Sequence, residues 1–116
     1  MIVDKPFTCN STDRILIIAK SGASKSDYYS NRQETRNTWM EDAKLLNIPV
    51  LFALAKPENL SFQDLIQEED HQFNDLIQFD FIDHYYNLTL KTINVFKWAS
   101  FNCPQINCFT YVDDDI

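Results

Sequence analysis

Three short apolar runs along the chain predict buried β-strands. Residues 14–20 contain a continuous apolar run rich in β-branched side chains, and residues 50–55 contain a second one. A third run covers residues 108–112 and leads directly into a group of aspartates. Runs of this kind are typical of strands that are covered on both faces of a sheet. Residues 75–79 are expected to form a further short strand or an extended link.

A first helix is predicted after a polar loop. Residues 21–30 are polar and include the only glycine of the chain, which indicates a loop. Asn31 and Glu34 have the spacing of a capping box, and the helix that they begin is expected to end near Leu46, before Pro49. The residues expected on the buried face of this helix are Thr35, Trp39, Ala43 and Leu46.

Two further helices are predicted from the spacing of apolar residues. Residues 62–73 form the first of them, with Phe62, Leu65, Ile66 and Glu69 at helical spacing. Residues 85–101 form a longer segment that is apolar on most sides. This last helix is expected to be mostly buried, because its polar positions form a single stripe of Asn87, Lys91 and Asn94.

The order of the predicted elements indicates an α/β fold. Strands and helices alternate, so we expect a mainly parallel sheet with helices on both faces. In such sheets, ligands bind beyond the carboxyl ends of the strands. The loop that begins at Ser21 and the triplet Asp113–Asp115 both follow predicted strands, so the sequence places them together at this edge.

Composition narrows the possible classes of function. With 116 residues, of which 45% are hydrophobic and 14% aromatic, the chain has the size and content of one folded domain. Its net charge of −7 argues against a nucleic-acid partner, because phosphate backbones are bound mainly by clustered Lys and Arg. No apolar run in the sequence approaches the length of about 18 residues that spans a membrane.

Sequons and cysteines bear on the cellular compartment. Sequons begin at Asn10, Asn59 and Asn87, and they have meaning only in a secretory compartment, although such triplets also arise by chance. Cys103 and Cys108 flank a short loop and could form a disulfide in an oxidising lumen, which would leave the third cysteine of the chain unpaired. Three unpaired thiols are the alternative.

The stretch Tyr111–Asp115 holds the strongest candidate chemistry. Its three adjacent carboxylates repel one another, and a divalent cation bound together with a nucleotide diphosphate would relieve this repulsion, since Mg²⁺ and Mn²⁺ prefer oxygen ligands. A solvated acidic turn is the alternative. The first four residues also match the YVDD signature of reverse transcriptases. That chemistry needs a basic template cleft, which the acidic composition of the chain argues against.

Three cations are further candidates. Arg32 and Arg36 lie one turn apart in the first turns of the predicted helix, where the helix dipole and their mutual repulsion disfavour positive charge. An anion is therefore expected nearby, either a substrate phosphate or a structural carboxylate such as Asp80 or Asp83. Lys91, on an otherwise apolar helix, could contact a nucleotide or could extend its ammonium group to the surface.

These candidates belong to three conspicuous blocks, Arg32–Trp39, Asp80–Thr92 and Asp113–Asp115. Shorter stretches accompany them, namely Ile15–Ile18, Ser21, Phe52–Leu54, Glu69, Asp75–Ile77, Trp98 and Cys103. In this order and spacing, the blocks resemble the β-1,3-glycosyltransferases of glycosyltransferase family 31. Tyr111 stands where the commoner family form has a lysine, which makes the chain similar to the Brainiac-like branch.

The resemblance implies a GT-A fold with a Rossmann-like sheet. It further implies an inverting, Mn²⁺-dependent transfer of galactose or N-acetylglucosamine from a UDP-sugar, in β-1,3 linkage, to a glycan on a glycolipid or glycoprotein. It also implies a type II protein of the Golgi membrane that faces the lumen, held by an anchor that this chain does not include.

The same resemblance implies roles for individual residues. Of the implied metal-site residues, Asp115 would ligate Mn²⁺, Asp113 would also bind on the ribose side of the nucleotide, and Asp114 would support the site. The residues implied around the donor are Ser21, near the uridine, and Arg36 and Lys91, which would organise the donor pocket.

The resemblance also divides the chain. Residues 1–13 correspond to an N-terminal extension, a remnant of the stem, and residues 14–116 to a partial catalytic domain that ends at the aspartate triplet. The general base is expected beyond Ile116, so this chain alone is expected to be inactive and marginally soluble. The alternative function is a non-catalytic lumenal module that binds a nucleotide sugar without turnover.

Overall fold

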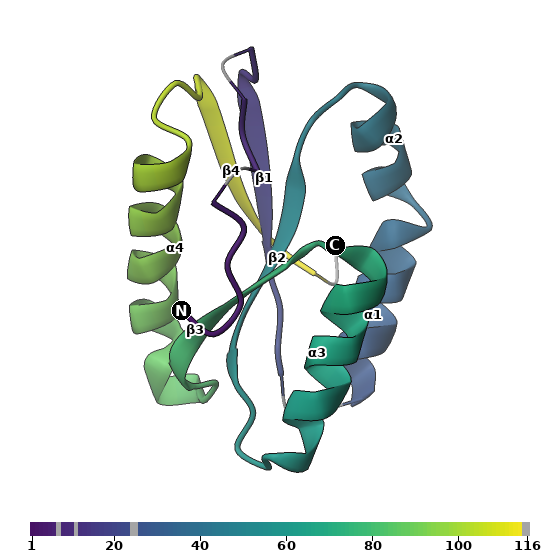
Figure 1. Ribbon diagram of the computed structural model, residues 1–116, viewed down its shortest axis with the longest axis vertical. Helices are drawn as coiled ribbons and strands as arrows, with labels where there is room; N and C mark the ends of the chain where they lie inside the picture. Colours follow the sequence, from purple (N-terminus) through teal and green to yellow (C-terminus); the bar gives the residue numbers. More distant parts are fainter. Residues whose placement is uncertain (7, 11, 24–25, 115–116) are drawn as a thin grey trace.

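The computed structural model describes residues 1–6, 8–10, 12–23 and 26–114, and its centre is a four-stranded sheet (Figure 1). The strands are β1 (Ile15–Lys20), β2 (Val50–Lys56), β3 (Leu76–Ile82) and β4 (Cys108–Asp113). They are parallel and lie in the order β3-β2-β1-β4. The predicted α/β fold with a mainly parallel sheet is confirmed, and the segment predicted as a short strand or a link is a full strand, β3.

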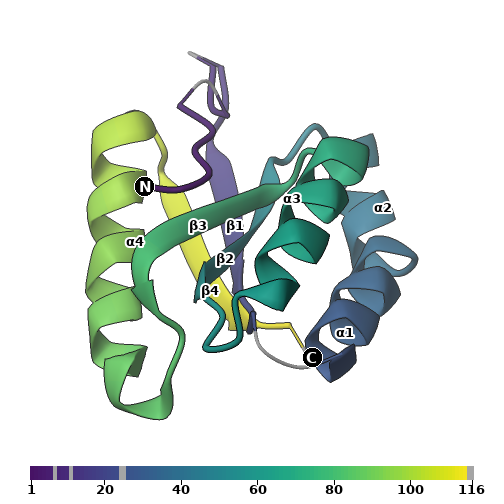
Figure 2. The ribbon, with the colours of Figure 1, turned by 60° about the horizontal axis from the view of Figure 1, so that its bottom comes forward.

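Helices cover both faces of this sheet. The helices α1 (Ser26–Arg36), α2 (Trp39–Leu45) and α3 (Ser61–Phe73) lie on one face, and α4 (Leu88–Asn102) lies on the other (Figure 2). A short 3₁₀ turn, Tyr85–Asn87, precedes α4. Parallel strands need crossover connections, and a helix is present between each pair of consecutive strands. The arrangement is Rossmann-like.

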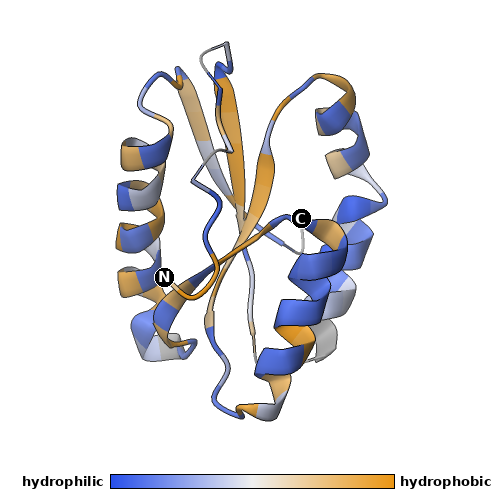
Figure 3. Ribbon diagram, viewed as in Figure 1, coloured by the Kyte–Doolittle hydropathy of each residue, from blue (hydrophilic) through white to orange (hydrophobic). Residues whose placement is uncertain are grey.

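Two apolar cores follow from the alternation of side chains along the strands. On the α4 side, Leu16 and Ile18 of β1 pack in one cluster with Val95 and Trp98 of α4. On the other side, Ala19 belongs to a second cluster, which includes residues of α2, β2 and α3. Figure 3 shows the result, with strands that are largely hydrophobic and helices α1 and α3 that are largely hydrophilic.

The bounds predicted for the first helix are wrong. α1 begins at Ser26, so the predicted loop is too long, and the proposed capping box of Asn31 and Glu34 lies inside the helix. The helix ends at Arg36, and α2 begins separately at Trp39. The sequence hid α1 because its inward side is not apolar. That side is formed by the buried residues Arg32, Thr35 and Arg36.

Leu46 and α4 also depart from the predicted burial. Leu46, expected on a buried face, follows α2 and is 71% exposed. In α4, Lys91 is buried, whereas Ile93 and Phe96 are about half exposed. The prediction of a mostly buried helix is therefore wrong, and Lys91, which was expected on its polar stripe, is one of its buried residues. Among the described residues, no helix is long and apolar enough to cross a membrane.

The segment before β1 is tied to the domain at several points. Val3 forms an isolated antiparallel bridge with β3. The indole N–H of Trp98 donates a hydrogen bond to Asp4 Oδ1 at 2.8 Å, and the ammonium group of Lys5 pairs with Asp70 at 2.8 Å. The described residues of the predicted extension therefore pack on the domain rather than project from it.

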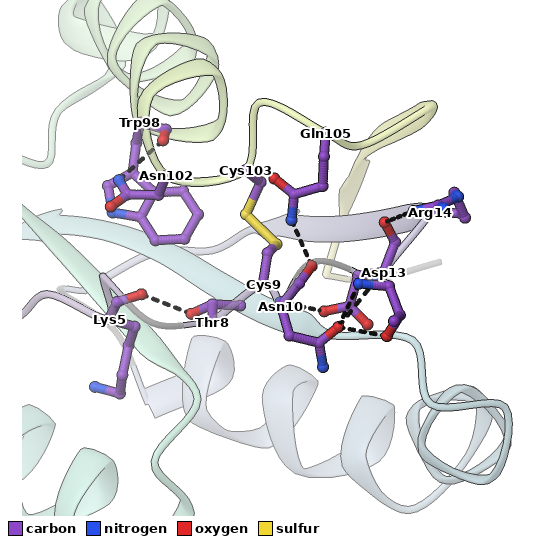
Figure 4. The surroundings of a disulfide bond; sticks show 11 residues. Lys5, Thr8, Cys9, Asn10, Asp13, Arg14, Trp98, Asn102, Cys103 and Gln105 are labelled. Atoms are coloured by element: carbon purple, nitrogen blue, oxygen red, sulfur yellow. Dashed lines mark hydrogen bonds between the residues drawn. A yellow bond between two sulfur atoms is a disulfide. The ribbon is translucent and has the colours of Figure 1, made fainter.

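A disulfide completes this attachment (Figure 4). Cys9 is bonded to Cys103, with 5.5 Å between their Cα atoms, and Cys108 is free and exposed. The predicted pairing of Cys103 with Cys108 is wrong, as is the alternative of three free thiols. Cys103 at the end of α4 is buried against the core, where Cys9 packs, whereas Cys108 begins β4 and its N–H donates to the carbonyl of Arg14.

Candidate functional site

The candidate site lies at the carboxyl ends of β1 and β4. From β1 the sheet is built outward through β2 and β3, and β4 is then added on the opposite side of β1. Such a reversal of strand order leaves a crevice at the strand ends, where ligands bind in open α/β sheets. The register pairs Lys20 with Asp113, so Ser21 and Asp114 follow side by side. The predicted meeting of the first loop with the aspartates is confirmed for Asp113 and Asp114.

Ser21 and Asp114 form a buried hydrogen-bonded pair. The hydroxyl of Ser21 donates to Asp114 Oδ2 at 2.6 Å, and both residues are more than nine-tenths buried. The backbone N–H of Asp114 donates to the carbonyl of Lys20, and that of Ser21 donates to the carbonyl of Ala53. Both residues are therefore held by the ends of the strands as well as by their side chains.

Arg32 of α1 fixes the loop that follows β1. One guanidinium nitrogen, Nη1, donates to the Ser21 hydroxyl and to the Gly22 carbonyl, each at 2.8 Å. Its other side, through Nε and Nη2, donates to the two carboxylate oxygens of Glu69 at 2.6 and 2.7 Å. A β-carbon at Gly22 would overlap the ring of Tyr28, so a larger residue here would displace that ring. The Ser21 hydroxyl thus accepts from a cation and donates to an anion.

The network continues through Glu69 to Arg36 and Asp75. Arg36 Nη2 donates to Glu69 Oε2 at 2.8 Å, and Nε and Nη2 bind both oxygens of Asp75 at 2.8 and 2.7 Å. The guanidinium carbon also lies 3.9 Å from the centre of the Phe73 ring. Burial alone would lower the pKa of Arg36, but hydrogen bonds and charge from Asp75 and Glu69 outweigh it and raise the pKa. Arg36 therefore remains a cation inside the protein.

Structural carboxylates were expected near the two arginines, and their presence is confirmed while their predicted identity is wrong. Asp80 pairs with Lys56 at 3.0 Å, and Asp83 pairs with Lys91 at 2.9 Å. Neither of these aspartates forms an ion pair with Arg32 or Arg36 in the described part of the chain. The helix-start argument also fails, because both arginines lie in the second half of α1.

Lys91 holds the same loop from the opposite face of the sheet. It is 2% exposed, and its ammonium group donates to the Ser21 carbonyl at 2.6 Å as well as pairing with Asp83. Of the two alternatives predicted for Lys91, extension of its ammonium group to the surface is therefore wrong. Near this ion pair, Asp83 Oδ2 is buried with no hydrogen-bond partner within the described residues, and the hydroxyl of Tyr111 is buried close to the side chain of Thr92. Burial and the nearby charges of Asp113 and Asp83 raise the pKa of Tyr111 to about 12.

Asp113 differs from Asp114 in its surroundings. Its carboxylate is about half exposed and pairs with Lys20 at 2.8 Å, whereas the Asp114 carboxylate is turned inward to Ser21. Asp113 is the last residue of β4, whereas Asp114 lies in the turn that follows the strand. Asp115, predicted to ligate a metal, lies outside the described residues. Within the described ranges, no group of three or more His, Cys, Asp or Glu side chains could hold a metal ion.

Sequence reasoning missed the parts that Glu69 and Asp75 play in the site. Glu69 stands on the side of its predicted helix where Phe62 and Ile66 also lie, and it is 5% exposed. A carboxylate on an otherwise apolar helix face was the available signal, because such a group needs a buried partner. Asp75 gave a weaker signal in the sequence, because an aspartate before a strand is also common in turns.

Comparisons with known proteins agree on one family. The model of a family described as galactosyltransferase matches residues 30–116. A human lactosylceramide 1,3-N-acetyl-β-D-glucosaminyltransferase is 36% identical over 99% of this chain and 32% of its own length. A rat UDP-GlcNAc:βGal β-1,3-N-acetylglucosaminyltransferase 7 is 30% identical over 100% of this chain and 31% of its own length. A mouse β-1,3-galactosyltransferase 1 is 32% identical over 99% of this chain and 35% of its own length. The chain thus spans about a third of the length of these relatives.

Proposed function

The chain belongs to the galactosyltransferase family, glycosyltransferase family 31, and we propose on this premise that it forms the donor-binding part of a β-1,3-hexosyltransferase. The donor is a UDP-sugar that carries galactose or N-acetylglucosamine, and the acceptor is a glycan on a lipid or protein. The names of the relatives support both sugars, and one of them supports a glycolipid acceptor. The observation that carries the proposal is the buried Ser21–Asp114 pair at the reversal of strand order.

The charges around this pair support binding of a diphosphate together with a cation. Five carboxylates, of Glu69, Asp75, Asp83, Asp113 and Asp114, face four cations, of Lys20, Arg32, Arg36 and Lys91. The four cations thus already interact with carboxylates, and one negative charge has no cation to balance it. A nucleotide diphosphate brings further negative charge to this edge, and a divalent cation is the simplest way to balance it.

Mn²⁺ is the cation that we propose, held by the aspartate triplet. The available donors are carboxylate oxygens, which hard divalent ions prefer, and the half-exposed Asp113 carboxylate can reach an ion that the inward Asp114 carboxylate reaches less readily. Asp115 is the third proposed ligand residue. When bound, the ion would stabilise negative charge on the departing nucleotide.

The buried side chains of the site are proposed to position rather than to react. Arg32 and Lys91 form hydrogen bonds with Ser21 and Gly22 from opposite faces of the sheet. Ser21 in turn orients the Asp114 carboxylate. A loop fixed before the donor arrives loses little conformational entropy on binding. Arg36 contributes indirectly, because it shares Glu69 with Arg32.

We propose the Golgi lumen as the compartment of the whole protein. The Cys9–Cys103 disulfide supports an oxidising compartment, and the three sequons are consistent with passage through the secretory pathway. A membrane anchor remains part of this proposal.

Calorimetric titration of the chain with UDP tests the proposed function. We expect binding that strengthens when Mn²⁺ is present and that weakens in Ser21→Ala, because this change removes the hydroxyl between Arg32 and Asp114. Ser100→Ala, at an exposed position of α4, serves as the matched control. Equal affinity for ADP and UDP, or no binding of UDP with Mn²⁺, would contradict the proposal.

A further inference from the structure

The loop between β2 and α3 carries an exposed sequon. Asn59, Leu60 and Ser61 form the triplet, and all three residues are exposed. The position between the asparagine and the serine is not proline, which would prevent modification. Leu60 is 72% exposed, so an apolar side chain stands in water beside the asparagine.

The asparagine side chain accepts hydrogen bonds through its oxygen only. Asn59 Oδ1 accepts from the Ser61 hydroxyl at 2.9 Å and from the Ser61 N–H at 3.0 Å. The carbonyl of Asn59 accepts from the N–H of Phe62 at 3.1 Å and so begins the first turn of α3. No hydrogen bond of the amide nitrogen, Nδ2, is formed within the described residues. The reactive atom of the sequon is thus free while its oxygen is held in place.

The other two sequons do not offer the same arrangement in full. Asn87 lies at the start of α4, and its Nδ2 donates to the Ile82 carbonyl at 2.8 Å, so the nitrogen is already used inside the fold. Asn10 Oδ1 accepts from the Thr12 hydroxyl at 2.6 Å, but residue 11 between them lies outside the described part of the chain. Asn59 therefore differs from Asn87 in its unused nitrogen, and it belongs to a sequon whose three residues are all described and exposed.

We propose that Asn59 is an N-glycosylation site that carries an oligosaccharide in the folded protein. This inference rests on the secretory compartment of the proposed function. The co-reactant is an oligosaccharide linked to a lipid pyrophosphate. A bond forms between Nδ2 and the anomeric carbon of the sugar, the bond from that carbon to the pyrophosphate oxygen breaks, and the lipid pyrophosphate leaves. The amide loses one proton from Nδ2.

The folded structure accommodates this product without rearrangement. Glycosylation consumes one hydrogen of Nδ2 and leaves Oδ1 unchanged, so both hydrogen bonds from Ser61 persist and the start of α3 is preserved. The attached sugar extends from an exposed loop into water and can cover the exposed Leu60 side chain. A glycan is bulky and solubilising, which suits a surface loop.

Glycopeptide mass spectrometry tests the proposal in two arms. In the first, the chain is secreted from a eukaryotic host behind a cleavable leader, and in the second the protein is isolated from its natural source. We expect a glycan on the Asn59 peptide that is removed by peptide N-glycosidase and absent in Asn59→Gln and in Ser61→Ala. Gln67→Ala, at an exposed position of α3 outside any sequon, is the control and keeps the glycan.

The two arms test the glycosylation site and the proposed compartment separately. A glycan on Asn59 in both arms supports the site and the compartment together. A glycan in the host arm that is absent from the natural protein supports the chemistry of the sequon but overturns the modification in the natural protein and contradicts the proposed compartment. An unmodified Asn59 in the host arm, with or without a glycan on Asn87, overturns the geometric argument itself, whatever the function of the protein.

Discussion

Replacement of Glu69 by glutamine is the sharpest perturbation of the buried network. The Glu69 carboxylate lies between two arginines and accepts three hydrogen bonds from them, at 2.6, 2.7 and 2.8 Å. Its side chain is 3% exposed, and those of Arg32 and Arg36 are 4% and 6% exposed. Glutamine keeps the shape but removes the charge, and its amide group turns N–H donors toward the N–H donors of an arginine.

The expected cost follows from these contacts. Removal of one partner from a buried ion pair typically costs about 3–5 kcal/mol, because the opposite charge is left without compensation. Asp75 still pairs with Arg36, so the main loss falls on Arg32, whose remaining hydrogen bonds among the described residues go to neutral groups of Ser21 and Gly22. We therefore expect a loss of about 3 kcal/mol, or roughly 10 °C in the midpoint of thermal unfolding for a domain of this size.

Thermal and urea unfolding followed by circular dichroism measure this loss. The matched control is Glu68→Gln, which makes the same chemical change at the exposed neighbouring position of α3 and is expected to change stability by less than about 0.5 kcal/mol. If Glu69→Gln unfolds at the same temperature as Glu68→Gln, the buried network does not stabilise the domain, and the argument from these contacts is refuted.

Two further predictions follow from the structure. The Cys9–Cys103 disulfide spans a sequence separation of 94, so its loss in Cys9→Ala should lower stability by up to about 4.7 kcal/mol by the chain-entropy estimate. Cys108→Ser should have little effect in urea unfolding, and peptide mapping that finds Cys103 bonded to Cys108 would contradict the structure. Since the folded-state pKa of Tyr111 is about 12 against an ordinary 10.0, the fold retains this proton, and its contribution to stability is present below pH 10 and is lost as the pH rises toward 12. An absorbance titration should contain a late tyrosinate component that Tyr111→Phe lacks, and an unchanged titration in this variant would disprove the assignment.

The local pattern of apolar residues was sufficient to predict the strands and the location of the candidate site. The apolar runs at residues 50–55 and 108–112 became β2 and β4, and alternation with helices indicated a parallel sheet. Since parallel strands align their carboxyl ends at one edge, the sequence alone placed Ser21 and the aspartates together. These predictions depend only on the order of elements along the chain.

The pairing of charges could not be predicted in the same way. Arg32 meets Glu69 across 37 positions, and Arg36 meets Asp75 across 39, and nothing local selects these partners over Asp80 or Asp83. The same polar side chains concealed α1, because a helix whose inward face is charged has no apolar periodicity. The burial of Lys91 likewise depends on a carboxylate, that of Asp83, supplied by the loop before its own helix.

The position of bound Mn²⁺ is the most direct test of the central claim, that the ends of β1 and β4 form the donor site. The measurement is the paramagnetic broadening of backbone amide signals in ¹⁵N-labelled protein when Mn²⁺ is added in the presence of UDP. We expect selective broadening at Ser21, Gly22 and Asp113, and sharp signals at Ile48 and Asn74, which lie before β2 and β3 at the opposite ends of the strands. Broadening should vanish in Asp113→Asn and persist in Asp64→Asn, an exposed aspartate of α3. Broadening centred elsewhere, or unaffected by Asp113→Asn, would contradict the account.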